Sequence, residues 1–114
     1  MDGRVTFKGG ADFDTVSLTE TPITDTVTLG LGAGINAAIL TKSSITGKLV
    51  VKGGADDDIV VLSETPVTGA ASLTLGAGSN TLTVDTGTVG ALKYAGGADA
   101  DTVIINAVTT PASI

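Results

Sequence analysis

Acidic and amide residues recur at fixed spacing along the chain, and they are the residues whose types could do chemistry. Each set is counted from five regularly spaced glycines. Two positions after these glycines stand Asp12, Gly34, Asp56, Gly78 and Asp99, and four positions after them stand Asp14, Asn36, Asp58, Asn80 and Asp101. Calcium takes six to eight oxygen ligands at about 2.3–2.6 Å, many of them carboxylates. One hypothesis is therefore that two adjacent glycine-rich turns hold calcium with backbone carbonyls and with Asp12, Asp14, Asp56, Asp58, Asp99 and Asp101.

The same residues also have an interpretation that needs no ion. Asp and Asn tolerate turn geometry and hydrogen-bond their own backbone, so stacked Asp and Asn side chains can fill the turns of a repeat protein. Alternating Asp with Asn or Gly would also keep like charges apart. A metal site and a purely structural ladder both remain open at this point.

The elements that must position these residues follow from the repeat itself. Five copies of one pattern begin at Gly10, Gly32, Gly54, Gly76 and Gly97, and only the last interval is shorter, by a single position. A fixed period of about 22 residues indicates a stacked array. Apolar residues alternate with polar ones before and after each glycine, as in Val27 and Leu29 or Val60 and Leu62. Alternation at period two predicts short strands with one buried face.

A third apolar column lies between successive repeat glycines, at Ile23, Ile45, Val67 and Val89. We therefore predict an all-β chain, a single-stranded right-handed parallel β-helix (β-solenoid) of about five rungs, each with three short strands. Handedness follows the rule for parallel crossovers. The whole of 1–114 is expected to form one domain. The alternating signs of Glu20, Lys42 and Glu64 agree with the register that the glycines define.

The acidic turns resemble the calcium-binding β-roll repeats of the RTX family, whose nonapeptide reads G-G-x-G-x-D-x-U-x. The segments 9–17, 53–61 and 96–104 fit this pattern, except that Asp12, Asp56 and Asp99 replace the third glycine. The resemblance covers under half of the chain, and the family packs two nonapeptides into each turn, which this chain does not. What the resemblance implies is calcium on the turn edge, with the aspartates as ligands.

Composition argues against several functions. Twelve acids and six bases give a net charge of −6, which disfavours nucleic acid and anionic membranes as partners. The chain has no cysteine and no histidine, and no apolar stretch is long enough to insert into a membrane. Pectate-lyase-like β-helices share the rung length, but they resemble long solenoids with a groove walled by extended loops. With short, uniform turns and Arg4 as the sole arginine, we predict that the chain is not an enzyme and has no catalytic residues.

An uncharged strip is predicted on the outward side of the strands that follow the repeat glycine. Its candidate binding residues are Thr15, Ile39, Ile59, Val61, Thr81, Thr83, Thr102 and Ile104. The strip resembles the faces of β-solenoid ice-binding proteins, although only Thr81-Leu82-Thr83 has their Thr-x-Thr form. Ice or polysaccharide binding is therefore one hypothesis, and a neutral β surface is the other.

The preferred expectation is a non-catalytic structural or adhesive segment, such as a stalk, spacer or fibre unit. By resemblance to bacterial repeat proteins, we place it outside the cell or on its surface. Open ends of a parallel solenoid expose unpaired backbone, so the expected partners are flanking solenoid repeats or other copies joined end to end. A calcium-dependent RTX-like binding module is the alternative, with calcium as the one cofactor considered.

Overall fold

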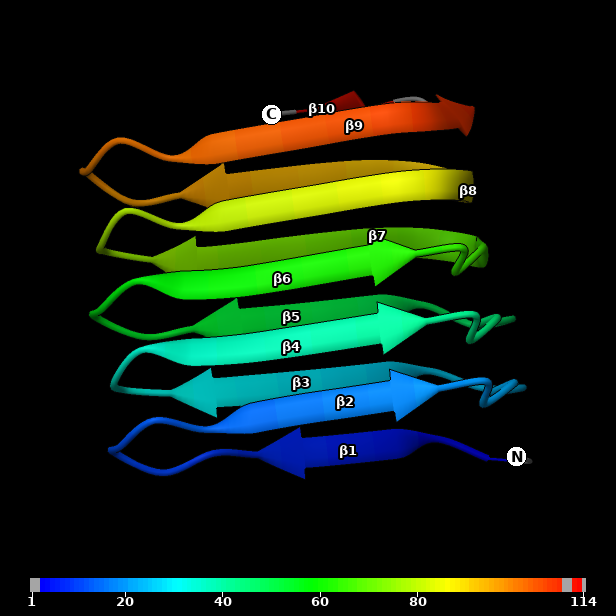
Figure 1. Ribbon diagram of the computed structural model, residues 1–114. Helices are drawn as coiled ribbons and strands as arrows, with labels where there is room; N and C mark the ends of the chain where they lie inside the picture. The colour runs from blue at the N-terminus through cyan, green and yellow to red at the C-terminus, as the bar shows by residue number, and fades with distance from the viewer. Residues whose placement is uncertain (1–2, 110–111, 114) are drawn as a thin grey trace.

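Ten strands follow one another along a rising coil in the computed structural model, which describes residues 3–109 and 112–113. In Figure 1 the strands nearest the viewer run rightward, those behind them run leftward, and the chain climbs, so the coil is right-handed. The strands are β1 (Val5–Lys8), β2 (Thr15–Thr19), β3 (Val27–Gly32), β4 (Asn36–Thr41), β5 (Leu49–Gly53), β6 (Asp58–Ser63), β7 (Val67–Gly76), β8 (Thr81–Gly96), β9 (Thr102–Thr109) and β10 (Ala112–Ser113).

All of the pairings are parallel, and they form two facing layers (Figure 1). Sheet A contains β1, β3, β5, β7, the second half of β8, and β10, whereas sheet B contains β2, β4, β6, the first half of β8, and β9. Along sheet A, Val5 pairs with Val27, Val27 with Leu49, Leu49 with Ala71 and Ala71 with Leu92. The predicted register of about 22 residues and the parallel β-solenoid of about five turns are both confirmed.

The apolar columns fill the space between the two sheets. Leu29, Leu40, Leu49 and Leu62 are almost completely buried, which is the inward half of each period-two pattern. Among the described residues of this core, Tyr94 is the one buried aromatic side chain. Burial, followed by the adjacent carboxylate of Asp101, raises the pKa of Tyr94 to about 12.

The third apolar column is buried as predicted, but it forms less regular structure than a full strand in the lower rungs. Ile23 pairs with Ile45, and Ile45 with Val67, as isolated bridges at a corner of the coil. In the upper rungs Val67 and Val89 belong to the long strands β7 and β8. Strand β8 bends around this corner without a break and so joins both sheets. No helix of the described residues is long and apolar enough to span a membrane.

Candidate functional site

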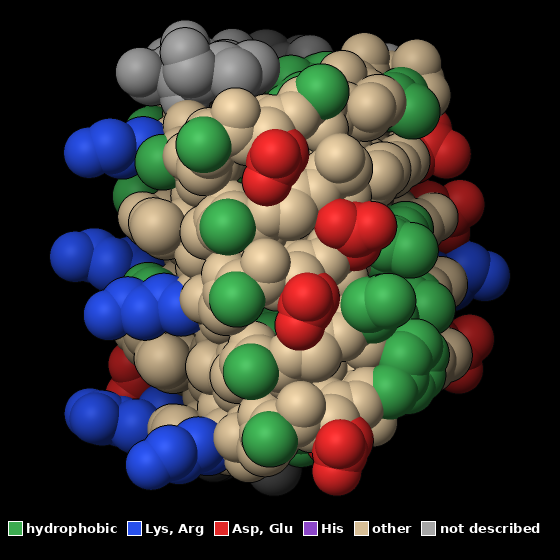
Figure 2. Space-filling model, turned by 90° about the vertical axis from the view of Figure 1, so that its left-hand side faces the viewer, with side chains coloured by type: hydrophobic (Ala, Val, Ile, Leu, Met, Phe, Trp, Pro, Cys, Tyr) green, Lys and Arg blue, Asp and Glu red, His purple; other side chains and the backbone are tan. Residues whose placement is uncertain are grey.

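The residues singled out for their chemistry lie together on one edge of the solenoid, where sheet A passes to sheet B. Figure 2 faces this edge and shows acidic side chains one above another. We call the turns at Asp14, Asp58 and Asp101 acidic turns, and those at Asn36 and Asn80 neutral turns. The two kinds alternate along the stack, since their residues lie in successive rungs.

In the first acidic turn the carboxylate faces a backbone donor of its own loop. The N–H of Gly10 donates to Oδ2 of Asp14 at 2.8 Å. This oxygen lies so close to the preceding residue that a Cβ on Gly9 would be 2.6 Å from it. Gly53 and Gly96 likewise lie against the carboxylates of Asp58 and Asp101. A glycine therefore precedes the repeat glycine in every acidic turn because the carboxylate, joined at Gly9 and Gly53 by a backbone oxygen of the next rung, occupies the space of a side chain.

In the neutral turns the peptide groups point the other way. Gly32 and Gly34 have φ values of 79° and 87°, which residues other than glycine rarely adopt. The turn carbonyls converge on the Asn36 amide, whose Nδ2 donates to the oxygens of Gly34 at 2.9 Å and Gly32 at 3.3 Å. Asn80 makes the same bonds to Gly76 and Gly78 at 3.1 and 3.2 Å. No carboxylate oxygen fills the space beside the repeat glycine, so leucine can precede it, and Leu31 and Leu75 are fully buried.

The side-chain oxygens of this column also connect one rung to the next. The N–H groups of Asp14, Asn36, Asp58 and Asn80 each donate to Oδ1 of the residue one rung further on, at 2.9, 3.1, 2.8 and 2.8 Å. We call this series the Asp/Asn ladder. It satisfies buried backbone donors at the point where the sheet ladders are interrupted by the turn, and such donors are costly when left unpaired.

Asp58 is the most enclosed acid of the ladder, with no exposed surface. Its Oδ1 accepts from both the backbone N–H and the side-chain amide of Asn36. Burial raises the pKa of Asp58, and the hydrogen bonds from Asn36 and the N–H of Gly54 oppose that rise. Oδ2 lies against Gly53 but has no aligned hydrogen-bond donor. The neighbouring Asn36 therefore compensates only part of the cost of burying this charge.

The column two residues after the repeat glycine forms a second set of bonds between rungs. The N–H of Gly34 donates to Oδ2 of Asp56 at 3.2 Å, and the N–H of Gly78 donates to Oδ2 of Asp99 at 3.1 Å. Asp57, in the adjacent column, accepts from the N–H of Ser79 at 2.7 Å. Asp56 and Asp99 thus each serve the neutral turn next to their own acidic turn, which agrees with the alternation of Asp with Gly in the sequence.

The six predicted calcium ligands are placed on one edge, but in separate rungs. Acidic turns are two rungs apart, or about 9.6 Å for parallel strands, and a neutral turn lies between each pair. Among the described residues no group of three or more acidic side chains is close enough to hold a metal ion. Oxygens of Asp14, Asp56, Asp58, Asp99 and Asp101 already accept N–H groups. The acidic side chains of this edge alone therefore do not supply the six to eight oxygens that calcium needs.

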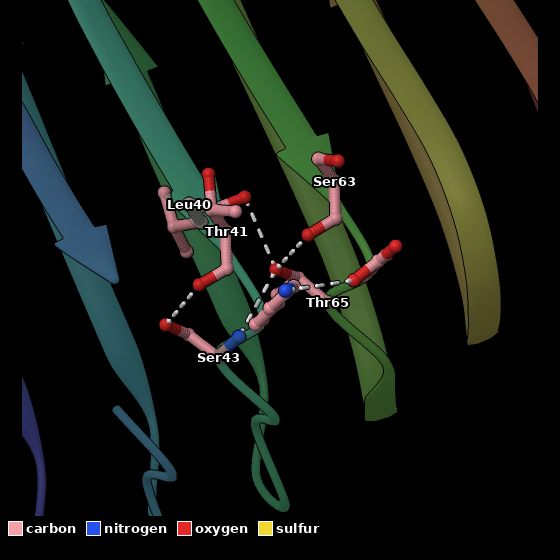
Figure 3. Close-up of polar contacts among 7 residues, drawn as sticks. Leu40, Thr41, Ser43, Ser63 and Thr65 are labelled. Atoms are coloured by element: carbon pink, nitrogen blue, oxygen red, sulfur yellow. Dashed lines mark hydrogen bonds and ion pairs between the residues drawn. The ribbon is translucent and has the colours of Figure 1, made fainter. Parts of the chain in front are cut away.

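A second polar column, at the opposite edge, was missed by the sequence analysis. The N–H groups of Thr21 and Ser43 donate to the hydroxyl oxygens of Ser43 and Thr65, at 3.1 and 3.3 Å. Those two hydroxyls in turn donate to strand-end carbonyls, as Figure 3 shows for Thr65 with Ser63 at 2.9 Å and Leu40 at 3.1 Å. The recurrence of Thr or Ser at Thr21, Ser43 and Thr65, one per rung, is the signal that could have revealed it.

The charged column next to these hydroxyls has a conformational role. Glu20, Lys42 and Glu64 have φ values of 50°, 51° and 47°. These values lie in the left-handed region, which costs a non-glycine residue conformational energy. Lys42 and Glu64 form an ion pair at 4.0 Å, with more than half of each side chain exposed. Such an exposed pair contributes at most about 1 kcal/mol, so the backbone turn is the main feature of this column.

The predicted uncharged strip is one continuous surface on the outside of sheet B. Its first rank pairs Thr15, Ala37, Ile59, Thr81 and Thr102, and its second pairs Ser17, Ile39, Val61, Thr83 and Ile104. Ile59 and Ile104 are 43% and 41% exposed. The structure therefore brings all eight candidate residues together, with isoleucines and hydroxyls intermixed. A shallow hollow of about 210 Å³ lies elsewhere, at the corner lined by Pro66, Val67, Thr68, Thr88 and Gly90.

These features define the protein as a parallel β-solenoid whose turns are closed by ladders of side-chain hydrogen bonds. No protein-family model, curated protein or solved structure matches the chain.

Proposed function

We propose that the chain is a non-catalytic structural or adhesive segment of an extracellular or cell-surface repeat protein, acting as a stalk, spacer or fibre unit. The observation that carries this proposal is the Asp/Asn ladder. The residues that resembled a metal site are used to close turns and to join successive rungs. Flanking solenoid rungs, or other copies joined at the open ends, are the partners that such a stack would use.

The short turns and smooth faces support this role over catalysis. Ligand sites are usually concave and of about 300–1,000 Å³, whereas the hollow beside Pro66 and Val67 measures about 210 Å³. Paired acids such as Asp12 and Asp14 lie on an exposed edge. A rigid spacer needs a continuous hydrogen-bonded stack, and this fold supplies one.

Thermal unfolding followed by circular dichroism, in EDTA and in excess calcium, tests the proposal. We expect a folded protein in EDTA and the same midpoint in calcium, because the ladder needs no ion. Sodium chloride at matched ionic strength is the control, since added salt also screens the repulsion among the edge acids.

The alternative is a calcium-dependent RTX-like module, and it predicts a different result. Calcium at one hundred times its dissociation constant would add about 2.7 kcal/mol per site, which would raise the midpoint by several degrees or more. A calcium-specific rise of that size, absent with sodium, would contradict the proposal.

A further inference from the structure

Five of the six basic residues lie on one face of the molecule. Lys8 and Lys52 are outward positions of one column of sheet A, in register with Gly30 and Thr74. Lys93 extends outward from the last part of β8, and Arg4 and Lys48 directly precede β1 and β5. All five are exposed. Figure 2 shows blue side chains projecting in successive rows along this side of the molecule. We call this surface the basic face.

One described acid borders the basic face: Asp25 is exposed at the corner, and its backbone lies against Gly47, next to Lys48. The strands of sheet A between Val5 and Gly96 carry Thr, Ser, Gly, Ala, Val and Lys on their outward side and no Asp or Glu. The ion pair that the described residues form involves Lys42, the sixth base, at a different edge. Five bases against this one acid leave the face with a positive local field in a chain of net charge −6, because the other described acids lie on the turn edges and not on this face.

The bases of the basic face are also regularly spaced. Arg4 and Lys8 lie in the first rung, Lys48 and Lys52 in the third, and Lys93 in the fifth. Arg4 and Lys48 share one column and Lys8 and Lys52 another, so these equivalent bases are two rungs, or about 9.6 Å, apart along the stack. Lys93 lies in the column between these two, in register with Ser72. The two bases of a pair are about 13 Å apart along the strand. Threonine and serine hydroxyls at Thr6, Thr28, Ser72 and Thr74 lie between them.

This arrangement selects among anionic partners. A small anion could contact only one base at a time, because the bases are too far apart for two of them to bind the same ion. The closely spaced phosphates of nucleic acid, or the broad plane of an anionic membrane, would also meet the acidic turn edges beside the face. A linear polymer with one or two charges per repeating unit could follow the stack and contact bases in alternate rungs. With no aromatic residue among the described outward positions of sheet A, the attraction must be electrostatic, with hydroxyls as secondary partners.

We infer that the basic face binds a linear acidic polysaccharide laid along the solenoid axis. This inference goes beyond the structural role proposed above, and neither depends on the other, because a calcium-free stack can exist without a ligand. The attraction is expected to fall steeply with salt, since it rests on several exposed cations.

Isothermal titration calorimetry in EDTA tests the inference, with chondroitin sulfate as the probe, because its carboxylates and sulfates recur with each disaccharide. The desulfated, carboxyl-reduced polymer is the uncharged control. We expect binding to the charged polymer alone, weakened about tenfold or more between 50 and 200 mM salt. The triple variant Lys8→Gln, Lys48→Gln, Lys52→Gln should bind at least about tenfold more weakly, from three lost exposed ion pairs. The Lys42→Gln variant should bind like the wild type.

Circular dichroism of both variants shows whether the fold survives, and a triple variant that fails to fold is replaced by Lys52→Gln and Lys8→Gln singly. Three results would overturn the inference. The folded wild type would not bind the polysaccharide, or Lys42→Gln would weaken binding as much as the triple variant does, or the protein would bind anionic lipid vesicles but not the polysaccharide. Sedimentation of the protein alone adds a fourth test. Self-association that the triple variant abolishes would show that the basic face instead meets the acidic edge of a second copy.

Discussion

Replacing Asn36 with Asp is expected to destabilise the protein by about 3–5 kcal/mol, the cost of an uncompensated buried charge. The change keeps the shape of the side chain and replaces the Nδ2 donor with an oxygen. That oxygen would face the carbonyls of Gly32, Ala33 and Gly34 and the carboxylate of Asp58, all of which accept from Asn36 at present. Since whole domains are stable by only about 5–15 kcal/mol, the variant should be close to unfolding. Urea denaturation at neutral pH measures the loss.

The matched control is Ala33→Asp, which adds the same charge to the same turn at an exposed position. It should change the free energy of unfolding by no more than about 0.5 kcal/mol. Acidification should reduce the difference in the free energy of unfolding between Asn36→Asp and the wild type, because a protonated carboxyl can again donate to a carbonyl. A loss under about 1 kcal/mol for Asn36→Asp, or one equal to that of Ala33→Asp, would refute the assigned role of the amide.

Replacing Gly32 with Ala is expected to cost more than about 3 kcal/mol, because a strained backbone and a steric clash add. The residue has a φ of 79°, which costs a non-glycine residue about 1–2 kcal/mol. Its new methyl group would also overlap the backbone oxygen of Gly10 and lie 3.1 Å from that of Gly9 in the rung below. Backbone atoms within a stacked sheet have little room to move, so the overlap cannot be relieved cheaply.

Gly10→Ala is the control for this second prediction, since Gly10 occupies the same column. A methyl group there meets nothing within 4 Å, and Gly10 is not among the residues with positive φ. Its effect should stay below about 1 kcal/mol, the usual size for a change that creates no clash. Thermal unfolding of the two variants in parallel makes the comparison, and equal midpoints would show that the neutral turn does not need its glycine.

The sequence predicts the solenoid well because its repeat is almost perfectly regular. Alternation at positions such as Val27 and Leu29 identifies inward residues, and the fixed interval gives the register directly, as the pairing of Val5 with Val27 confirms. The corner at Ile23 and Ile45 was predicted to be buried, and it is, but bridges rather than a regular strand form there. Apolar columns report burial, and they do not report how long a strand continues through a corner.

The partners of the acidic and amide residues were harder to predict. Asp14 and Asn36 occupy equivalent positions, yet the first faces an N–H and the second faces carbonyls. That difference depends on the direction of the turn peptides, which is set by positive φ at Gly32 and Gly34. Alternation of Gly9 with Leu31 was visible in the sequence, but its cause, the carboxylate of Asp14 and the backbone oxygen of Leu31 beside Gly9, required coordinates.

Amide hydrogen exchange in EDTA, followed by NMR, tests the central claim that the Asp/Asn ladder closes the stack without an ion. The four amides of Asp14, Asn36, Asp58 and Asn80 each donate to a side-chain oxygen of the next rung. We predict that the amides of Asn36 and Asp58, in the middle of the stack, exchange as slowly as those of their strand neighbours Ala38 and Val60. All four amides should become exposed in the same cooperative unfolding event. Rapid exchange at Asn36 and Asp58 in EDTA, becoming slow when calcium is added, would contradict the account.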